Sequence, residues 1–217
     1  MTVVSSSSSS PSSTQILTLL SSTKTSTIAS TSTCYSAPTN YLTNPGFEAT
    51  TSWGSATNPW VLDAPSTQWS AGSTGSYSLS MYRYSGSRGF AAYSSNYTAV
   101  LTLEQTVTIP VGVKVKVGGY VKNLRGVSST ATQPLSFVLS LDDSPVYTYS
   151  PSNAGSSWTE VKPSTNSFLA GATTSTHTFT FQVSSKLTAT SDKSAYIFAA
   201  DDFYVTPLSG PNGEKIC

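Results

Sequence analysis

Apolar and polar side chains alternate with a period of two along most of the chain from residue 40 onward. This alternation is typical of β-strands with one buried face, because successive side chains of a strand point to opposite sides. It predicts strands within residues 77–81, 101–109, 113–121, 135–141, 179–183 and 195–205. Residues Tyr77, Leu79 and Met81 should share one buried face. In 113–121 the valines should face inward, with lysines at 114, 116 and 122 and Tyr120 opposite.

Turn signals separate these segments, as in Pro110-Val111-Gly112 and Asp142-Asp143-Ser144-Pro145. No segment of comparable length shows the 3.6-residue apolar stripe of a helix. Several short strands with one buried face each predict two packed antiparallel sheets. The fold class is therefore all-β, a jelly-roll β-sandwich of about eight to ten strands.

A Ser/Thr-rich segment precedes this region, with 21 Ser or Thr among the first 33 residues. Such a segment buries too little apolar surface to offset its ordering entropy, which predicts disorder. It is either an O-glycosylated stalk or an unmodified tail. We divide the chain into a disordered Ser/Thr-rich stalk (1–36), a β-sandwich module (37–208) and a C-terminal tail (209–217).

Charge is sparse and balanced, with 11 Lys plus Arg against 10 Asp plus Glu and 10% charged residues. The absence of any basic run argues against nucleic-acid binding. No stretch reaches the roughly 18 apolar residues of a membrane span. The low charge and abundant hydroxyl side chains are typical of secreted or cell-wall β-proteins. No basic residue precedes the apolar residues 16–20, so this start does not read as a signal peptide.

The two cysteines, Cys34 and Cys217, bracket the predicted fold. They form either a disulfide that joins neighbouring ends of the domain in an oxidising compartment, or two unpaired thiols.

Several segments resemble carbohydrate-binding modules of the family 4/9 (CenC-like) type. The opening Asn40–Glu48 stretch, followed by Trp53, is similar to their N-terminal signature. Residues 75–80 resemble the Gly-led strand that follows it, and 199–205 resemble the final strand with an aspartate before an apolar pair. Together with the turn at 110–112, the order and spacing match across residues 40–208. The Ser/Thr-rich stalk followed by such a module resembles fungal secreted proteins.

The resemblance implies a galactose-binding-like jelly roll that binds polysaccharide or oligosaccharide, often as an appendage of a glycoside hydrolase in a larger multidomain secreted protein. It also implies structural calcium between the first and last strands. Calcium prefers six to eight hard oxygen ligands. The matching positions are Gly46, Glu48, Thr74, Tyr77 and Asp201. The alternative is that turn amides or a nearby lysine satisfy Glu48 and Asp201.

Asp201 adds a physical argument for such a site. It lies in phase with Ile197, Ala199 and Phe203, which should face inward. A buried carboxylate needs a partner or a metal.

Sugar recognition needs flat aromatic rings and a few polar groups. Outward-facing tyrosines, an arginine beside them and a loop tryptophan supply candidates, although outward tyrosines also simply cover many sheet surfaces. The candidate sugar-binding residues are Tyr82, Arg83, Tyr84, Tyr120, Tyr147 and Trp60.

The other tryptophans have different expected roles. Trp53 should pack in the core, Trp158 resembles a partly buried structural tryptophan of the family, and Trp69 lies in loop sequence like Trp60. The sequon at Asn96 is a candidate N-glycosylation site.

Catalysis has weak support in the sequence. The single histidine, His177, is in phase with Phe179 and Phe181, which suggests a histidine at the edge of the core. No nucleophile-elbow pattern is present. Glycoside hydrolysis requires two carboxylates that flank the bond, and acidic residues are available. We therefore expect a non-catalytic sugar-binding module. A structural or adhesive wall domain and a glycoside hydrolase remain the alternatives.

Overall fold

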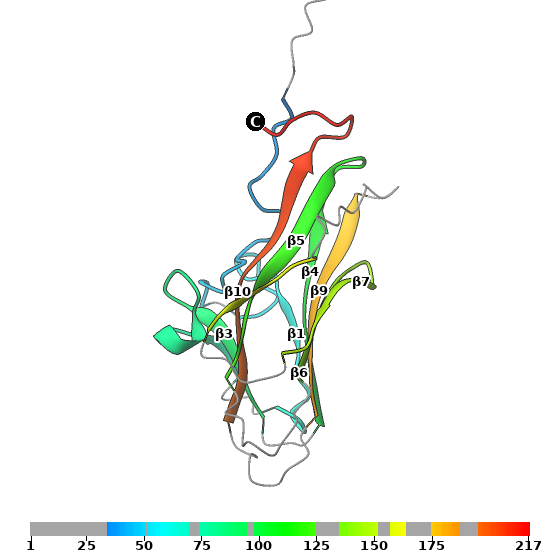
Figure 1. Cartoon of the computed structure of the whole chain (residues 1–217). Coiled ribbons are helices and arrows are strands. Elements are labelled where there is room, and N and C mark those ends of the chain that lie inside the picture. The colour runs from blue at the N-terminus through cyan, green and yellow to red at the C-terminus, as the bar shows by residue number, and fades with distance from the viewer. Residues whose placement is uncertain are drawn as a thin grey trace, which may run out of the picture. The chain divides into compact units, whose positions relative to one another are not determined.

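The computed structural model describes residues 34–50, 52–69, 74–94, 98–124, 135–151, 157–163, 175–186 and 195–217. The Ser/Thr-rich residues 1–33 and the sequon at Asn96 lie outside these ranges. Within the described residues the domain is a jelly-roll β-sandwich of two five-stranded antiparallel sheets, with one 3-10 turn, η2 (Ser80–Tyr82) (Figure 1). These residues include no helix long and apolar enough to cross a membrane.

The first sheet has the strand order β1-β4-β9-β6-β7. Its strands are β1 (Val61–Asp63), β4 (Thr98–Thr108), β9 (Thr176–Lys186), β6 (Leu135–Leu141) and β7 (Ser144–Tyr149). The strands β4 and β9 pair over their whole lengths, from Thr98 opposite Lys186 to Thr108 opposite Thr176.

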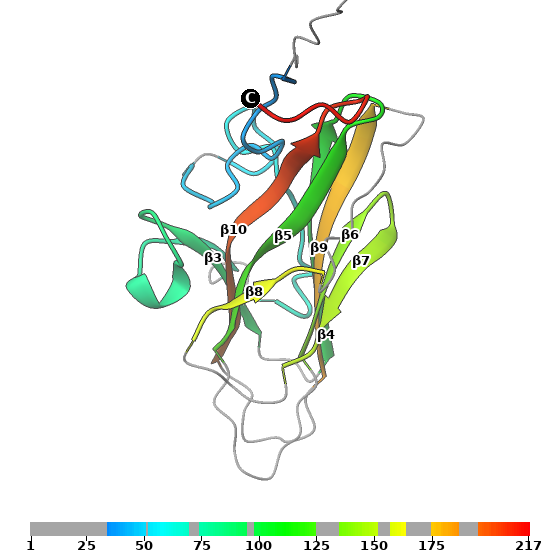
Figure 2. The same ribbon diagram turned by 45° about the horizontal axis from the view of Figure 1, so that its top comes forward.

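The second sheet has the strand order β2-β3-β10-β5-β8 and carries the candidate site described below. Its strands are β2 (Thr74–Tyr77), β3 (Gly89–Ser94), β10 (Ala195–Ser209), β5 (Lys114–Asn123) and β8 (Thr159–Val161). Figure 2 shows β8 lying beside β5, at the same side of the sandwich as the β6-β7 hairpin.

The core lies between the two sheets and consists of the inward faces that alternation predicts. Side chains at every second position of β4, β5, β6 and β9 are almost fully buried. They are Leu101, Leu103, Val107, Val115, Val117, Val121, Leu135, Phe137, Leu139, Leu141, Phe179, Phe181 and Val183. The predicted strands and their buried faces are therefore confirmed for these four strands.

Gln105 interrupts the apolar face of β4 and is nevertheless 2% exposed. Its side-chain amide accepts a hydrogen bond from the Thr43 amide at 2.6 Å and donates one to the Thr43 carbonyl at 2.9 Å. Burial of this polar group is tolerated because both ends of the amide are paired. Gln105 thus fixes the N-terminal segment to the sandwich.

The predicted buried face at residues 77–81 is wrong. Strand β2 ends at Tyr77 and the chain then makes the turn η2, which breaks the period of two. Leu79 and Met81 are 56% and 49% exposed, whereas Tyr82 is buried. Tyr82 packs with Ala91 and Ala199 on the side of the second sheet that faces away from the main core.

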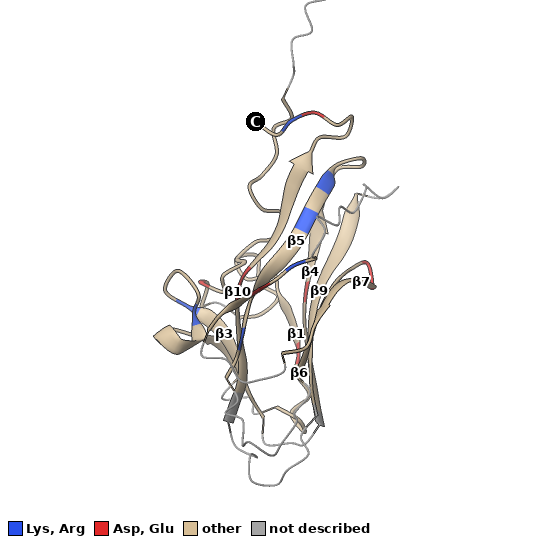
Figure 3. Ribbon diagram, viewed as in Figure 1, with Lys and Arg blue, Asp and Glu red and all other residues tan. Residues whose placement is uncertain are grey.

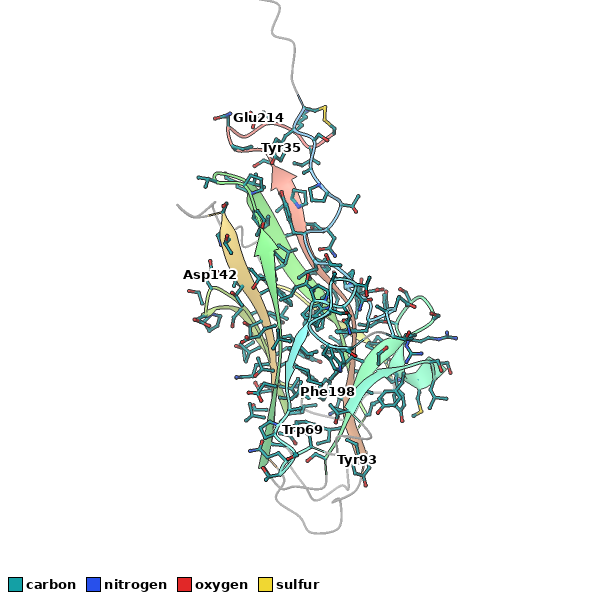
Figure 4. The ribbon with its side chains drawn as sticks, turned by 180° about the vertical axis from the view of Figure 1, so that it is seen from behind. Tyr35, Trp69, Tyr93, Asp142, Phe198 and Glu214 are labelled. Carbon is teal, nitrogen blue, oxygen red and sulfur yellow. A yellow bond between two sulfur atoms is a disulfide. The ribbon has the colours of Figure 1, made fainter. Side chains whose placement is uncertain are left out.

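The two ends of the domain are joined. Cys34 and Cys217 form a disulfide with a Cα–Cα distance of 5.1 Å. Beside it, the Tyr35 amide donates to the Lys215 carbonyl at 2.7 Å, and the Cys217 amide donates to the Tyr35 carbonyl at 3.0 Å. Figure 4 shows Tyr35 and Glu214 close together at this end, with Phe198 between the sheets. The sequence allowed either a disulfide or two unpaired thiols, and the structure contains the disulfide.

Candidate functional site

The outward face of the second sheet carries the candidate site. On β5, Val117 and Val121 point into the core, so that Tyr120 and Lys122 project from the opposite face. Tyr120 lies opposite Asp201 of β10 on one side and opposite Glu160 of β8 on the other. Three strands therefore contribute side chains to one outward surface.

Three aromatic rings form what we call the aromatic platform: Tyr84, Tyr120 and Trp158. The Tyr84 ring stacks on the Tyr120 ring with a centroid distance of 3.7 Å and an interplanar angle of 10°. Trp158 contacts Tyr84 edge-on at 5.9 Å. Tyr84 is 46% exposed, so the platform presents aromatic surface to solvent. Such rings can pack against the C–H faces of a sugar.

Polar groups surround the platform. The Tyr204 hydroxyl donates to Glu160 Oε1 at 3.0 Å, and Lys162 forms an ion pair with Glu160 Oε2. Burial opposes ionisation of Glu160, but the hydrogen bonds from Lys162 and Tyr204 outweigh it and lower its pKa. Glu160 is therefore ionised near neutral pH and can accept hydrogen bonds from sugar hydroxyls.

The hydroxyls of Tyr120 and Tyr204 remain protonated. The hydrogen bond with Tyr84, burial and the negative charge of Glu160 raise the pKa of Tyr120 to about 12. Burial and the hydrogen bond to Glu160 also raise the pKa of Tyr204. Both hydroxyls thus stay available for hydrogen bonding across the physiological range.

The loop at residues 83–88 carries Tyr84, and Asp201 fixes one half of it. Asp201 Oδ2 accepts hydrogen bonds from the amides of Tyr84 at 2.6 Å and Ser85 at 3.1 Å. Burial and the nearby charge of Asp202 raise the pKa of Asp201 to about 7, although the amide hydrogen bonds oppose this shift. The position of Tyr84 over Tyr120 thus depends on a fully buried carboxyl group.

Glu48 fixes the other half of this loop. Its carboxylate accepts hydrogen bonds from the Ser87 amide at 2.9 Å, the Ser87 hydroxyl and the Arg88 amide at 3.2 Å. Gly86 has a φ of 58°, and a Cβ there would overlap Glu48 Oε1. Glycine is required at this position for both reasons.

Asp201 is buried as predicted, but it faces away from the core between the sheets. A β-bulge follows it, because Asp201 lies opposite Tyr120 whereas Tyr204 lies opposite Gly118. Asp202 adopts a φ of 46° within this bulge. The extra residue returns Phe203 to the core and leaves Asp201 in phase with Ala199 on the outward face. The predicted common face of Ile197, Ala199, Asp201 and Phe203 is therefore wrong.

Three carboxylates lie near Gly46, where the resemblance predicts calcium. A Cβ at Gly46 would lie 2.9 Å from Asp202 Oδ1, 3.3 Å from Asp201 Oδ1 and 3.9 Å from Glu48 Oε1. Hard carboxylate oxygens in this space suit calcium. Among the described residues, however, no group of three acidic, His or Cys side chains is arranged to hold a metal ion by side chains alone. Backbone oxygens and water would have to complete any coordination shell.

Two of the predicted calcium ligands lie elsewhere. Thr74 pairs with Ala92 of β3, which in turn pairs with Phe198 of β10. Phe198 precedes Asp201 by three residues, so Thr74 lies away from the Asp201 carboxylate. It lines a cavity of about 210 Å³ with Trp53, Leu62, Ala64 and Trp69. The Tyr77 side chain packs edge-on against Tyr82 at 5.7 Å. The phase of β2 explains both positions, because Thr74 and Tyr77 are three positions apart and therefore point to opposite faces.

Two of the predicted sugar-binding residues have structural roles at the loop. Tyr82 is 5% exposed and lies beneath the loop that carries Tyr84. Arg83 donates from one guanidinium nitrogen to the carbonyls of Gly86 and Ser87, each at 3.2 Å. Arg83 thus braces the loop from within.

Trp60 and Tyr147 do not belong to the platform. Trp60 is fully buried against Phe47 and Phe203, and its indole nitrogen donates to the Asn44 carbonyl at 2.9 Å. Tyr147 lies on β7 of the first sheet, opposite the buried Leu139, and packs against the edge of the core. The stacking role predicted for Trp60 is wrong, and Trp69, 2% exposed, is likewise a core residue.

His177 lies at the edge of the core, as its phase with Phe179 predicts. It is 5% exposed, and its Nδ1 lies 2.7 Å from Asp142 Oδ2. Burial opposes ionisation of Asp142, but the hydrogen bonds with His177 and the Thr178 amide outweigh it and lower its pKa. This pair connects the β6-β7 turn to β9.

Sequence reasoning missed three residues of the site: Trp158, Glu160 and Tyr204. A signal was available for two of them. Val161 is buried, so alternation places Trp158 and Glu160 together on the outward face. The phase of Tyr204 could not be read, because it follows the bulge at Asp202.

No protein-family model and no curated protein matches the sequence. Among solved structures, TmCBM61 in complex with β-1,4-galactotriose is similar, with a TM-score of 0.50 and 18% identity, covering 77% of this chain and 98% of that chain. The CBM22-1 xylan-binding domain from Paenibacillus barcinonensis Xyn10C gives a TM-score of 0.44 and 16% identity over 76% of this chain and 92% of that one. A Stig cyclase, Fisc from Fischerella sp. TAU, gives 0.47 and 14%, covering 79% and 98%. At 18% identity the likeness to TmCBM61 concerns the fold alone.

Proposed function

We propose that this domain is a non-catalytic module that binds polysaccharide outside the cell. The observation that carries the proposal is the aromatic platform, in which Tyr84 stacks on Tyr120 and remains 46% exposed. The Glu160 carboxylate and the Tyr204 hydroxyl supply hydrogen-bonding groups beside it. Flat aromatic surface with a few convergent polar groups is the arrangement that sugar rings require.

Other features support this reading. The opening motif at residues 40–48 resembles that of family 4/9 modules, and the fold is shared with TmCBM61, whose structure holds β-1,4-galactotriose. The Cys34–Cys217 disulfide suits an oxidising, extracellular environment.

Isothermal titration calorimetry against galactan, xylan, β-glucan and chitin oligosaccharides tests the proposal. Loss of the stacking ring in Tyr84→Ala should weaken binding at least about fivefold, since an aromatic contact of this kind contributes about 1 kcal/mol beyond its buried area. Tyr84→Phe, which keeps the ring, should bind nearly as well. Val111→Ala is a matched control, because Val111 is 51% exposed in the turn between β4 and β5.

Two outcomes would refute the proposal. A folded protein that gives no heat with any of these glycans would favour a structural or adhesive wall domain. Release of reducing ends from any of them would favour a glycoside hydrolase.

We also propose that calcium stabilises the domain through Glu48, Asp201, Asp202 and the backbone of Gly46. Bound there, the cation would neutralise three clustered carboxylates. A ligand that binds only the folded state at a hundred times its Kd adds about 2.7 kcal/mol to the free energy of unfolding. Calcium should therefore raise the Tm and EDTA should reverse the effect. Magnesium, which demands stricter octahedral geometry, should do less.

A further inference from the structure

Lysine side chains are concentrated on the face that carries the aromatic platform. Along β5, positions 114, 116, 120 and 122 all point outward, because the residues between them face the core or are glycine. Three of these four are lysine, and the fourth is Tyr120 of the platform. Figure 3 shows these basic positions along β5. At about 3.4 Å per residue, this row from Lys114 to Lys122 is about 27 Å long.

Two further observations connect the row to the platform. Lys116 Nζ lies 5.3 Å from the centroid of the Tyr204 ring, so this charge is held beside the aromatic surface. Lys162, just after β8, adds a fourth lysine on the other side of Tyr120, where it pairs with Glu160. The platform therefore lies within a row of positive charges.

Little negative charge balances these lysines. Glu160 is already paired with Lys162, and Asp202 at the bulge acts electrostatically on Tyr120. Asp201 is fully buried, and its carboxyl group accepts hydrogen bonds from the amides of Tyr84 and Ser85. Glu48, a third acid near the platform, is already hydrogen-bonded to Ser87 and Arg88, so that four lysines share this face with three exposed or half-exposed acids. Among the described residues, the only ion pair that involves one of these lysines is that between Lys162 and Glu160.

The outward face of the first sheet is different in character. Between residues 100 and 108, the outward positions of β4 include Thr102, Glu104 and Thr106. These three β4 residues pair with Gln182, Thr180 and Thr178 of β9, in that order. This face offers hydroxyls, an amide and a carboxylate. In a chain whose net charge is only +1, the lysines on the platform face are therefore a local feature.

We infer that the ligand of the platform is an anionic polysaccharide, one with carboxylate or sulfate groups along its chain. This inference rests on the proposed function and specifies its substrate class. Sugar rings would stack on Tyr84 and Tyr120, and the acidic substituents would lie over the lysines of β5. Lysine ammonium groups act as flexible point charges, which suits acidic groups repeated along a mobile polymer.

Binding is measured by affinity electrophoresis and calorimetry with matched polymers. Polygalacturonate is compared with neutral galactan, and dextran sulfate with dextran. The affinity for at least one acidic polymer should exceed that for its neutral counterpart, and it should fall about tenfold between low and high salt because salt screens exposed charges. The preference between polygalacturonate and dextran sulfate shows which acidic group is bound.

Variants locate the effect. Lys116→Gln and Lys122→Gln should each weaken binding of the acidic polymer about twofold to fivefold, the range expected for an exposed ion pair, and leave neutral polymer unaffected. Lys215→Gln removes the same charge from the exposed C-terminal segment and should change nothing. Tyr84→Ala should weaken binding of both kinds of polymer.

The failures are distinguishable. Neutral polymer bound as tightly as acidic polymer, with no salt dependence, would overturn the inference while the proposed function stands. An equal loss in Lys215→Gln and Lys116→Gln would show attraction by net charge alone and would also overturn it. No binding of any polymer by the folded domain would refute both.

Discussion

The free energy of unfolding of the calcium-free domain should fall as the pH rises from about 4 to about 7. The cause is Asp201, whose burial and proximity to Asp202 raise its pKa from 3.8 to about 7 in the folded state. In this window the folded state retains a proton that the unfolded chain has released. The stabilisation is therefore complete below the unfolded pKa and is lost as the pH rises through the folded value.

The magnitude follows from this difference in proton binding. Each pH unit within the window changes the free energy of unfolding by about 1.4 kcal/mol, so that the full window corresponds to about 4 kcal/mol as an upper figure. Glu48, Asp142 and Glu160 have lowered pKa values and act with the opposite sign. Their stabilisation is present above the unfolded pKa, near 4.5 or below, and is lost only as the pH falls further. Between about pH 5 and pH 7, the change in the free energy of unfolding is thus caused mainly by Asp201.

Urea unfolding followed by tryptophan fluorescence, in EDTA at several values between about pH 5 and pH 7.5, measures this dependence. The free energy of unfolding of the wild-type protein should fall across the series. That of Asp201→Asn should be lower at about pH 5 and should change much less with pH. Calcium should stabilise the wild type most at the upper end, where Asp201 is ionised. A wild-type stability that is constant or increases over this range would show that Asp201 is ionised in the metal-free fold, and the reasoning would fail.

Three further changes test local features. Asp143, at a φ of 60° in the turn between β6 and β7, should be replaceable by Gly with a gain of about 0.5 kcal/mol in chemical unfolding, because type I′ turns favour glycine there. Gly86→Ala should cost at least about 1–2 kcal/mol through its left-handed conformation alone, and the overlap with Glu48 should also weaken glycan binding; unchanged binding would contradict the role of the loop. The paired substitution Cys34→Ser and Cys217→Ser, which opens a loop with a sequence separation of 183, should lower the free energy of unfolding by up to about 5 kcal/mol, and an unchanged urea midpoint would contradict this.

The strands of the two sheets could be predicted where the period of two is uninterrupted. Strands β4, β5, β6 and β9 each bury one face, and their alternating Leu, Val and Phe residues determine which face that is. Gln105 broke the apolar pattern without changing its phase, because its amide is paired with Thr43. For these strands, the residues that the alternation marks as apolar are the residues that pack in the core.

Prediction failed where the backbone departs from that period. The turn η2 exposes Leu79 and Met81 and buries Tyr82, and the bulge at Asp202 moves Asp201 to the outward face. Neither departure has a reliable local signal, since it depends on contacts with distant segments. Trp60 is a similar case, because loop sequence suggested exposure and only its packing on Phe47 and Phe203 shows that it is buried.

The candidate site combines both situations, which explains why its residues could be predicted in part and their arrangement could not. Tyr120 and Lys122 follow from the alternation of β5, and Trp158 and Glu160 would have followed from the same rule applied to β8. Tyr84 reaches Tyr120 through a loop that Asp201 and Glu48 hold, and Asp201 faces this loop because of the bulge that follows it. The acids expected as metal ligands therefore also position the Tyr84 ring. A variant that releases this loop should weaken glycan binding even when Tyr84 and Tyr120 are intact.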